Sequence, residues 1–443
     1  MKDLYDKQRA MRRIREAALQ RGVIGVLDIG SSSITCIVLQ FDGPSRSRET
    51  DGVGPLAGQA DFRVIGAGTT RARGIRFGEI DTMSEAERAV RTVVAKAQKV
   101  AGVRLDHVIA CLSGARPASY GLAGEVALRS GKVRKEDVAS VLAACDLPEF
   151  GRGREVLHAQ PVNFAVDQRS GLSDPREHAG NRLACDMHLL TVESDAIGNL
   201  IHCLRRCDLE LAGVASAAYM SGLSSLVEDE QELGAACIDM GGGATGVSIF
   251  MRKHMIFADS VRIGGELITS DIAQGLRVPW AMAERLKTLN GGVEATGRDD
   301  RDMIQIDGDE DWHEERRMVS RADLIGIMRP RVEEILEQVR EVLDAAGFDY
   351  MPSRQIVLTG GSSQIPGLDG LASRILGQNV RIGRPLRING LPHQLTNAGC
   401  ASAVGLALFA AHPQDEWWDF EMPVEAYPAR SFRRAYRWFR ANW

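Results

Sequence analysis

The chain has 443 residues, of which 44% are hydrophobic and 26% are charged, so it is long enough for two or more domains with cores of their own. Its net charge of −5 argues against general nucleic-acid binding. We expect neither a membrane-spanning helix, because no apolar run approaches the necessary roughly 18 to 20 residues, nor a signal peptide, because the basic residues 1–22 lack an apolar core.

The expected elements alternate between strands and helices. Strands are expected at 23–30, 33–41, 107–114, 187–193 and 209–214, and helices at 84–102, 134–146 and 195–207. Further on we expect consecutive strands around glycine turns at 234–268, a helix at 269–292 interrupted near Pro279, an acidic loop at 294–315 and a helix at 324–346 broken at Pro330. A strand, glycine turn and helix at 355–376 and a small-residue helix at 397–412 follow. Residues 42–61 read as a loop, residues 1–21 as a disordered or lightly helical segment, and residues 415–428 as a flexible acidic linker.

The eight cysteines are scattered along the chain. Only "HCLRRC", His202 to Cys207, is close-set, and it lacks a second ligand pair at the spacing of a zinc site. Buried reduced thiols are therefore favoured over a metal site.

One pattern occurs twice, about 210 residues apart. "VLDIGSSSITCIV" and "CIDMGGGATGVSIF" each place an Asp at the end of an apolar strand, then a turn of small residues, then a second strand. Small residues let backbone N–H groups approach phosphate oxygens, and the Asp can hold Mg²⁺ through water. One such hairpin is weak evidence, but the pair, with "TGGSSQIPG" as a third glycine turn, predicts a triphosphate clamped between two domains.

These motifs resemble the actin/Hsp70/sugar-kinase ATPase superfamily, and within it the FtsA family of bacterial cell-division proteins. The family resemblance covers about residues 22–412 and the tail, and is most specific in "RGIRFGEIDTMSEAERAV", "GGELITSDIAQGL", "LIGIMRPRVEEIL" and "VRIGRPLRINGL". It implies an α/β, two-lobed actin-like ATPase fold with an FtsA-type inserted subdomain and a C-terminal amphipathic helix. It also implies ATP and Mg²⁺ as cofactors, self-assembly into filaments, contact with other divisome proteins, and anchoring of FtsZ to the cytoplasmic face of the inner membrane at the division site.

The resemblance also assigns site residues. Phosphate contacts fall to Gly30, Ser31, Ser32, Ser33, Gly241, Gly242, Gly243 and Thr245, and Mg²⁺ to Asp28 and Asp239. Glu284 would bond the ribose, Lys287 would lie along the adenine, and Gly360, Gly361, Ser362 and Ile365 would flank the nucleoside. Without the resemblance, Glu284 and Lys287 read as an ordinary exposed helix pair.

The second hairpin departs from the family pattern. It reads Ala244-Thr245-Gly246 where the family often has Thr-Thr-Asp, and "VASAAYMSG" shows no polar residue suited to orient the attacking water. We therefore expect ATP binding with weak ATPase activity at most, and assign no catalytic residue.

The resemblance places partner docking on the helix around Arg331 and Glu334, where FtsA-like proteins bind the C-terminal peptide of FtsZ. The alternative is a solvated helix face, which is the usual meaning of mixed charge at this spacing.

The last 14 residues, "RSFRRAYRWFRANW", carry five arginines and no acidic residue. On a helical wheel the aromatic side chains form one stripe opposite a cationic face. A short helix of this kind suits the interface of an anionic membrane, through Phe432, Arg433, Arg434, Tyr436, Arg437, Trp438, Phe439, Arg440 and Trp443. The alternatives are packing of the helix on the body and a basic target segment for another macromolecule.

Together these features predict the following division of the chain. The segments are 1–21 (basic N-terminal segment), 22–83 and 166–232 (first lobe), 84–165 (inserted subdomain), 233–268 and 347–398 (second lobe), 269–346 (partner docking), 399–413 (connecting helix), 414–429 (linker) and 430–443 (membrane helix). The alternative functions are a pilus-assembly-type actin-like scaffold, which would lack the tail, and a sugar or acetate kinase, which would need a catalytic Asp that no motif marks.

Overall fold

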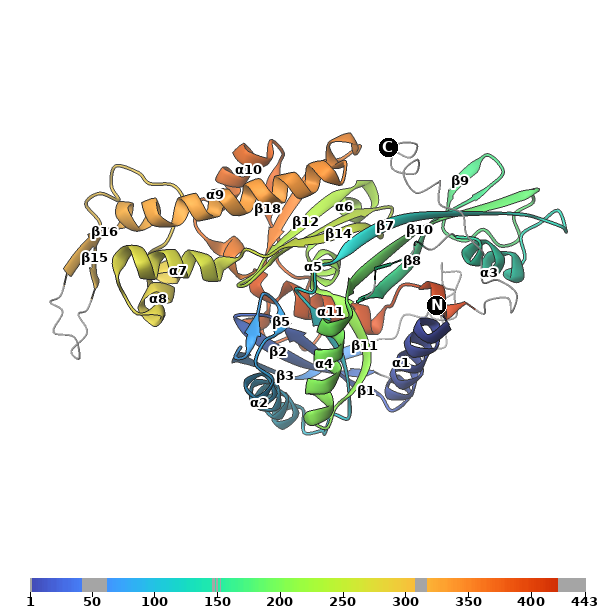
Figure 1. Cartoon of the computed structure of the whole chain (residues 1–443), viewed down its shortest axis with the longest axis horizontal. Helices are drawn as coiled ribbons and strands as arrows, with labels where there is room; N and C mark the ends of the chain where they lie inside the picture. Colours follow the sequence, from blue (N-terminus) through green and yellow to red (C-terminus); the bar gives the residue numbers. More distant parts are fainter. Residues whose placement is uncertain are drawn as a thin grey trace.

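The computed structural model describes residues 2–41, 62–145, 148, 150–151, 153–306 and 317–420. They form two lobes, one above the other in Figure 1, and a further unit of strands at one end. Among them is no helix both long and apolar enough to cross a membrane. The tail 430–443 lies outside the described residues.

The first lobe is built on a five-stranded sheet in the order β11-β6-β1-β2-β3. Its strands are β1 (Val23–Ile29), β2 (Ser33–Phe41), β3 (Phe62–Arg71), β6 (His107–Leu112) and β11 (Glu210–Ser216). The helices α2 (Met83–Ala101) and α4 (Ser194–Arg206) belong to this lobe, and α2 packs on β2 and β3. A turn between β3 and α2 holds the short strands β4 (Ile75–Arg76) and β5 (Glu79–Ile80).

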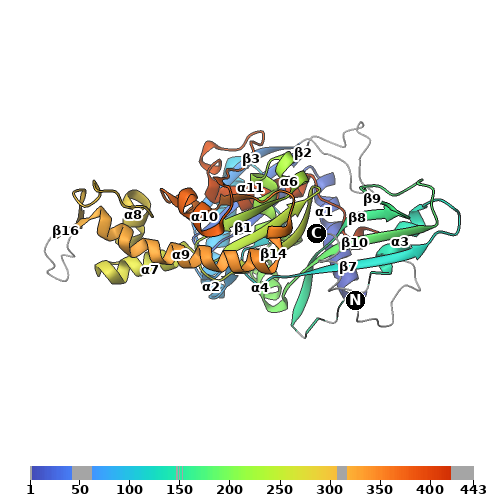
Figure 2. The same ribbon diagram turned by 90° about the horizontal axis from the view of Figure 1, so that it is seen from above.

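The second lobe repeats this plan with the sheet β14-β13-β12-β17-β18. Its strands are β12 (Ala235–Met240), β13 (Thr245–Met251), β14 (His254–Val261), β17 (Gln355–Thr359) and β18 (Val380–Ile382). Its helices are α6 (Glu228–Leu233), α7 (Gly265–Leu276), α8 (Trp280–Asn290), α9 (Arg321–Ala345) and α10 (Leu368–Leu376). At the far end, α7, α8 and the hairpin β15 (Met303–Ile306) and β16 (Arg317–Ser320) project from the sheet, as both views show (Figures 1 and 2).

The third sheet lies at the opposite end, in the order β7-β10-β8-β9 (Figure 2). It consists of β7 (Ala118–Ala127), β8 (Arg154–Val166), β9 (Arg169–Leu172) and β10 (Arg182–Glu193), with α3 (Lys135–Ala143) on one face. This unit differs in its bounds from the expected insert at 84–165. The helix at the start of that range packs on the first lobe, and β10, which pairs with both β7 and β8, lies beyond its end.

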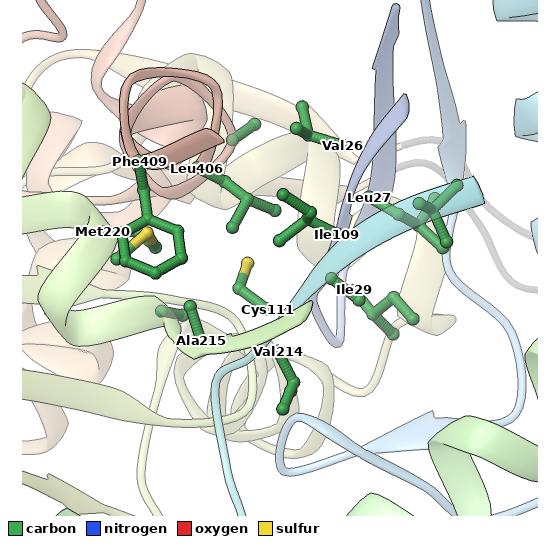
Figure 3. Close-up of a cluster of buried hydrophobic side chains, with 14 of the residues drawn as sticks. Val26, Leu27, Ile29, Ile109, Cys111, Val214, Ala215, Met220, Leu406 and Phe409 are labelled. Atoms are coloured by element: carbon green, nitrogen blue, oxygen red, sulfur yellow. The ribbon is translucent and has the colours of Figure 1, made fainter. Parts of the chain in front are cut away.

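Two helices of small residues run through the middle of the molecule, α5 (Ala217–Ser225) and α11 (Ala401–Ala411). Their backbones touch, since a Cβ added at Gly405 would lie 1.7 Å from the carbonyl oxygen of Met220. Figure 3 shows how the core of the first lobe closes on them, with Ile109 and Cys111 of β6 facing Leu406 of α11. These helices therefore join the two lobes at a point where nothing larger than glycine fits.

The N-terminal segment is the helix α1 (Lys2–Gln20), docked on the body. Arg15 is 3% exposed and donates to the carbonyl oxygens of Phe409 and Ala410, at 2.6 and 2.7 Å, at the end of α11. Arg12 forms an ion pair with Asp419. The expectation of a disordered or lightly helical segment was wrong, because α1 has a buried guanidinium that caps another helix.

The first part of the expected flexible linker is also packed. Trp417, Trp418 and Phe420 are buried, and the carboxylate of Glu416 accepts hydrogen bonds from the ring of His158 at 2.8 Å and the backbone of Ala159 at 3.0 Å. The chain thus stays attached to the body as far as Phe420, the last described residue.

The expected break at Pro330 does not occur, since α9 continues through it. A helical proline clashes with the carbonyl four residues earlier, which here belongs to Gly326. That position is exposed, with no atom within 4 Å of an added Cβ, so the helix has room to adjust.

Candidate functional site

The two glycine hairpins face each other across a cavity of about 680 Å³ between the lobes. The first is the β1–β2 turn and the second is the β12–β13 turn. Of the predicted nucleotide and metal residues, these line the cavity: Asp28, Gly30, Ser31, Ser32, Ser33, Asp239, Gly241, Gly242, Gly243, Glu284, Lys287, Gly360, Gly361, Ser362 and Ile365. A cavity of this size suits a nucleotide-sized ligand.

The second hairpin has glycine at positions 242 and 243 because the first hairpin approaches its backbone closely there. A Cβ at Gly242 would lie 1.9 Å from Ser32 Oγ, and one at Gly243 would lie 2.3 Å from Ser31 Oγ. A side chain at either glycine would therefore displace the serine hydroxyls of the first hairpin. Backbone N–H groups and serine hydroxyls meet here from both lobes, which is the donor set that phosphate oxygens need.

Two aspartates line the cleft, one from each lobe: Asp28 is buried and Asp239 is half-buried. Asp28 accepts hydrogen bonds from Ser402 Oγ at 2.7 Å and Cys111 Sγ at 3.0 Å, and Asp239 accepts one from Ser221 Oγ at 2.5 Å. Burial raises the pKa of Asp28. Burial, and secondarily the charge of Asp28, raises the pKa of Asp239 to about 6. A hydrated divalent cation between these two carboxylates would relieve the cost of their desolvation.

Lys287 and Glu284 lie on α8 at the edge of the cleft. The Lys287 ammonium donates to Gly265 O at 3.0 Å, Thr269 Oγ1 at 2.8 Å and Glu284 Oε2 at 2.7 Å. The side chain of Lys287 is only 11% exposed, so the pair is not an ordinary solvated helix pair.

The third glycine turn closes the cleft from the second lobe. Gly360 has φ 87°, a conformation that favours glycine, and an added Cβ there would lie 2.4 Å from Asp239 Oδ1. Ser362 Oγ donates to Gly241 O at 3.2 Å, so this turn is tied to the second phosphate hairpin.

Thr245 lies differently from the prediction. It begins β13, is fully buried, and donates its hydroxyl to Ile263 O at 2.8 Å, so it does not line the cavity. The pairing of Thr245 with Met240 and Val261 places it inside the sheet, and register of this kind cannot be read from a turn motif.

Sequence reasoning missed several cleft residues. Glu266, at the start of α7, lies between the hairpins, with its carboxylate 3.5 Å from Ser32 Oγ, and burial raises its pKa. Ser221 and Ser402, the partners of the two aspartates, come from the connecting helices. The sequence could have indicated Ser221 and Ser402, because each is a polar residue within one of the two small-residue helices that connect the lobes.

In the described part of the chain, no group of three or more His, Cys, Asp or Glu side chains is placed to hold a metal ion. Seven of the eight are buried free thiols, and Cys400 is partly buried.

Arg331 and Glu334 lie on α9, away from the cleft. Arg331 donates to Asp271 Oδ2 at 2.7 Å and also pairs with Glu334. Its side chain is 27% exposed. The cluster Asp271, Arg331 and Glu334 is thus an internal ion network with one side open to solvent.

Two hairpins, two connecting helices and a cleft between similar lobes define the class of actin-like ATPase folds. Among solved structures, the chain resembles a PilM–PilN type IV pilus biogenesis complex (TM-score 0.58, 16% identity, 87% of this chain and 98% of that one). It also resembles MreB5 of Spiroplasma citri bound to ADP (TM-score 0.51, 13% identity, 88% and 96%). At these identities the likeness establishes the fold.

The sequence comparisons name the family. The family model "Cell division protein FtsA" matches residues 236–405, and "SHS2 domain inserted in FTSA" matches residues 114–191. The cell division protein FtsA of Rhizobium meliloti is 38% identical over 394 residues, 87% of each chain. The chain belongs to the FtsA family and is an actin-like cell-division protein.

Proposed function

We propose that this chain binds ATP with Mg²⁺ between its lobes, assembles into filaments through copies of itself, and anchors FtsZ to the cytoplasmic face of the inner membrane. The observation that carries the nucleotide part is the pair of hairpins in contact around the cavity, Ser31 and Ser32 against Gly242 and Gly243. The solved MreB5 of the same fold is bound to ADP.

In this proposal the phosphates lie between the hairpins, held by backbone N–H groups and the serine hydroxyls. Mg²⁺ would be held through water by Asp28 and Asp239, and would supply charge neutralisation of the phosphates. Lys287 and Glu284 would hold the nucleoside from α8, opposite the turn at Gly360. Turnover is weak, because neither the second hairpin nor α5 offers a residue placed to activate water.

The nucleotide part is tested by titrating a fluorescent ATP analogue in the presence of Mg²⁺. We expect saturable binding by the wild type and severe loss in Gly243→Val, whose side chain would occupy the space of Ser31. The matched control is Gly297→Val, in an exposed loop where an added Cβ meets no atom within 4 Å. Equal binding by both variants would refute the cleft as the nucleotide site.

Docking of the FtsZ C-terminal peptide is proposed for the subdomain 269–346, at Arg331 and Glu334. The ion network there refines the test, since Arg331→Glu would place a third carboxylate beside Asp271 and Glu334 and disturb the fold. Arg331→Gln removes the charge with less repulsion. It should weaken peptide binding while leaving ATP affinity unchanged, whereas Arg329→Gln, which breaks the exposed pair with Glu333, should change neither. Unaltered peptide affinity in Arg331→Gln would remove Arg331 from the site.

Membrane attachment is proposed for residues 430–443, and it makes the protein peripheral at the division site. Aromatic residues at headgroup depth and arginines on anionic lipid give a short helix only modest affinity. Polymerisation would add the avidity that a single short helix lacks.

A further inference from the structure

A turn of the first lobe, Gly74 to Ile80, contacts both the inserted sheet and the second lobe. It includes the short strands β4 and β5 between β3 and α2. Its backbone N–H at Gly78 donates to Ser31 Oγ at 2.8 Å. The turn therefore fixes one of the two hydroxyls that face the second phosphate hairpin.

The side chain of Glu79 extends from this turn to two other elements. Its Oε1 accepts the backbone N–H of Ala115 at 3.0 Å and the Arg262 guanidinium at 3.0 Å. Ala115 lies three residues before β7 of the inserted sheet, and its carbonyl accepts the N–H of Glu193, the last residue of β10, at 2.9 Å. Arg262 lies in the second lobe, after β14. One carboxylate oxygen thus joins the first lobe, the insert and the second lobe.

Phe77 strengthens the same junction. The Arg262 guanidinium lies 4.6 Å from the centre of the Phe77 ring, within range of a cation–π interaction. The backbone of Phe77 also approaches the second hairpin, since a Cβ added at Gly243 would lie 3.0 Å from Phe77 Cα. Because the turn contacts both hairpins, a shift of either hairpin would displace the turn.

The junction is held in a strained backbone. Phe77, Ala115 and Arg116 are non-glycine residues with φ values of 52°, 70° and 44°. Such conformations persist only where the surroundings enforce them, and they concentrate at switch regions and ligand clamps. Glu79 contacts one of these three residues directly, since it accepts the backbone N–H of Ala115.

The insert also contacts the second lobe directly, where β7, β8 and β10 lie against β14. Ser119 Oγ accepts the N–H of Ala258 at 2.8 Å and lies 2.8 Å from Ala258 O, to which it can donate. This contact lies only a few residues along the chain from Ala115 and Arg262. The insert is therefore in a position to follow relative movement of the two lobes.

From these contacts we propose that Glu79 is a positioning residue of the nucleotide cleft. It holds the turn that orients Ser31, and it transmits the state of the cleft to the inserted sheet through Ala115. The inference rests on the proposed nucleotide site and deepens it, since it identifies a route by which nucleotide would change the orientation of the insert relative to the lobes.

The test compares wild type, Glu79→Ala and Glu79→Gln, in the full chain. Affinity for the fluorescent ATP analogue with Mg²⁺ is measured first, and then hydrogen exchange of peptides covering residues 28–36 and 113–122, with and without nucleotide. Glu228→Gln is the matched control, because Glu228 pairs with Lys253 at the surface and does not line the cleft.

For the wild type and Glu228→Gln we expect nucleotide to slow exchange in both peptides. Glu79→Ala should weaken binding by about threefold to thirtyfold, as for loss of a charge-assisted hydrogen bond. In Glu79→Ala, saturating nucleotide should still slow hydrogen exchange of residues 28–36, but it should no longer slow exchange of residues 113–122. Glu79→Gln keeps a neutral acceptor for Ala115 but loses the charge opposite Arg262, so its effect should be intermediate.

A purely structural role for Glu79 would speed exchange in both peptides without removing the response of residues 113–122 to nucleotide. That result, or wild-type behaviour of Glu79→Ala in both measurements, would overturn the inference while leaving the nucleotide site standing. Absence of binding by the wild type would instead refute the proposed nucleotide function, and the coupling with it.

Discussion

The contact between the connecting helices gives a sharp prediction for Gly405→Ala. A Cβ at this position would lie 1.7 Å from the Met220 carbonyl oxygen and 2.4 Å from its carbon, whereas real Cβ contacts essentially never fall below 3.0 Å. The obstacle is helix backbone, which cannot rotate away as a side chain can, so α5 and α11 must separate.

The expected magnitude follows from two opposing terms. Overpacking of a buried site costs about 1–3 kcal/mol and occasionally more, and the severity of this clash places it at or above the upper end. Alanine regains up to about 1 kcal/mol of helix propensity over glycine. We therefore expect Gly405→Ala to lower the free energy of unfolding by about 2 kcal/mol or more.

Gly198→Ala in α4 is the matched control. This glycine is also helical, but it is exposed, and an added Cβ meets no atom within 4 Å. The substitution should raise the free energy of unfolding, by up to about 1 kcal/mol. The free energy of unfolding of both variants is measured by urea unfolding followed by far-UV circular dichroism. Because both substitutions are Gly→Ala, the loss of conformational entropy in the unfolded chain is the same in each.

The same substitution should affect the cleft. Ser402 of α11 and Ser221 of α5 hold the two aspartates, so separating the helices displaces both carboxylates, and nucleotide affinity should fall together with stability. If Gly405→Ala were as stable as wild type, the close contact of the connecting helices would be incorrect.

Three further predictions concern buried charge. Burial lowers the pKa of His188 to about 3 and that of His254 to about 4. Both values lie below the unfolded value of about 6.5, so below that pH the unfolded chain binds protons that the folded protein does not. The free energy of unfolding should therefore fall as the pH drops below 6.5, by about 1.4 kcal/mol per pH unit for each histidine. Urea midpoints between pH 7 and 5 test this, and a slope unchanged in His254→Gln would contradict it. Lys287→Met should weaken binding of the ATP analogue by about tenfold to a hundredfold, the loss of charge-assisted hydrogen bonds, and unchanged affinity would remove Lys287 from the site. Glu416→Gln replaces one carboxylate oxygen by an amide N–H₂, which would face one of two donors, the His158 ring or the backbone N–H of Ala159. It should therefore lower the melting temperature, at a cost of about 1–3 kcal/mol; an unchanged melting temperature would show that this segment is not part of the core.

Much of the cleft could be predicted because its residues are contiguous in sequence. Asp28 to Ser33 and Asp239 to Gly243 are each one strand end and one turn, so the chemistry is readable locally. Thr245 was misplaced because its side-chain direction depends on strand register.

Features that depend on long-range packing escaped prediction. The insert is a sheet whose central strand, β10, pairs with β7 and β8, so its bounds follow from tertiary pairing rather than from the helix pattern at 84–102. The docking of α1 rests on Arg15, which reads as a solvated charge until the end of α11 is placed beside it. Glu79 and Arg262 are 183 residues apart, and no local pattern links them.

The measurement that tests the central claim most directly is co-sedimentation with liposomes containing anionic lipid, with and without ATP and Mg²⁺. It compares the full chain with a chain ending at Pro428. We predict that the full chain sediments with the liposomes, more strongly when ATP is present, and that the shortened chain stays in the supernatant while still binding nucleotide. Equal sedimentation of both chains would contradict the assignment of residues 430–443 as the membrane anchor.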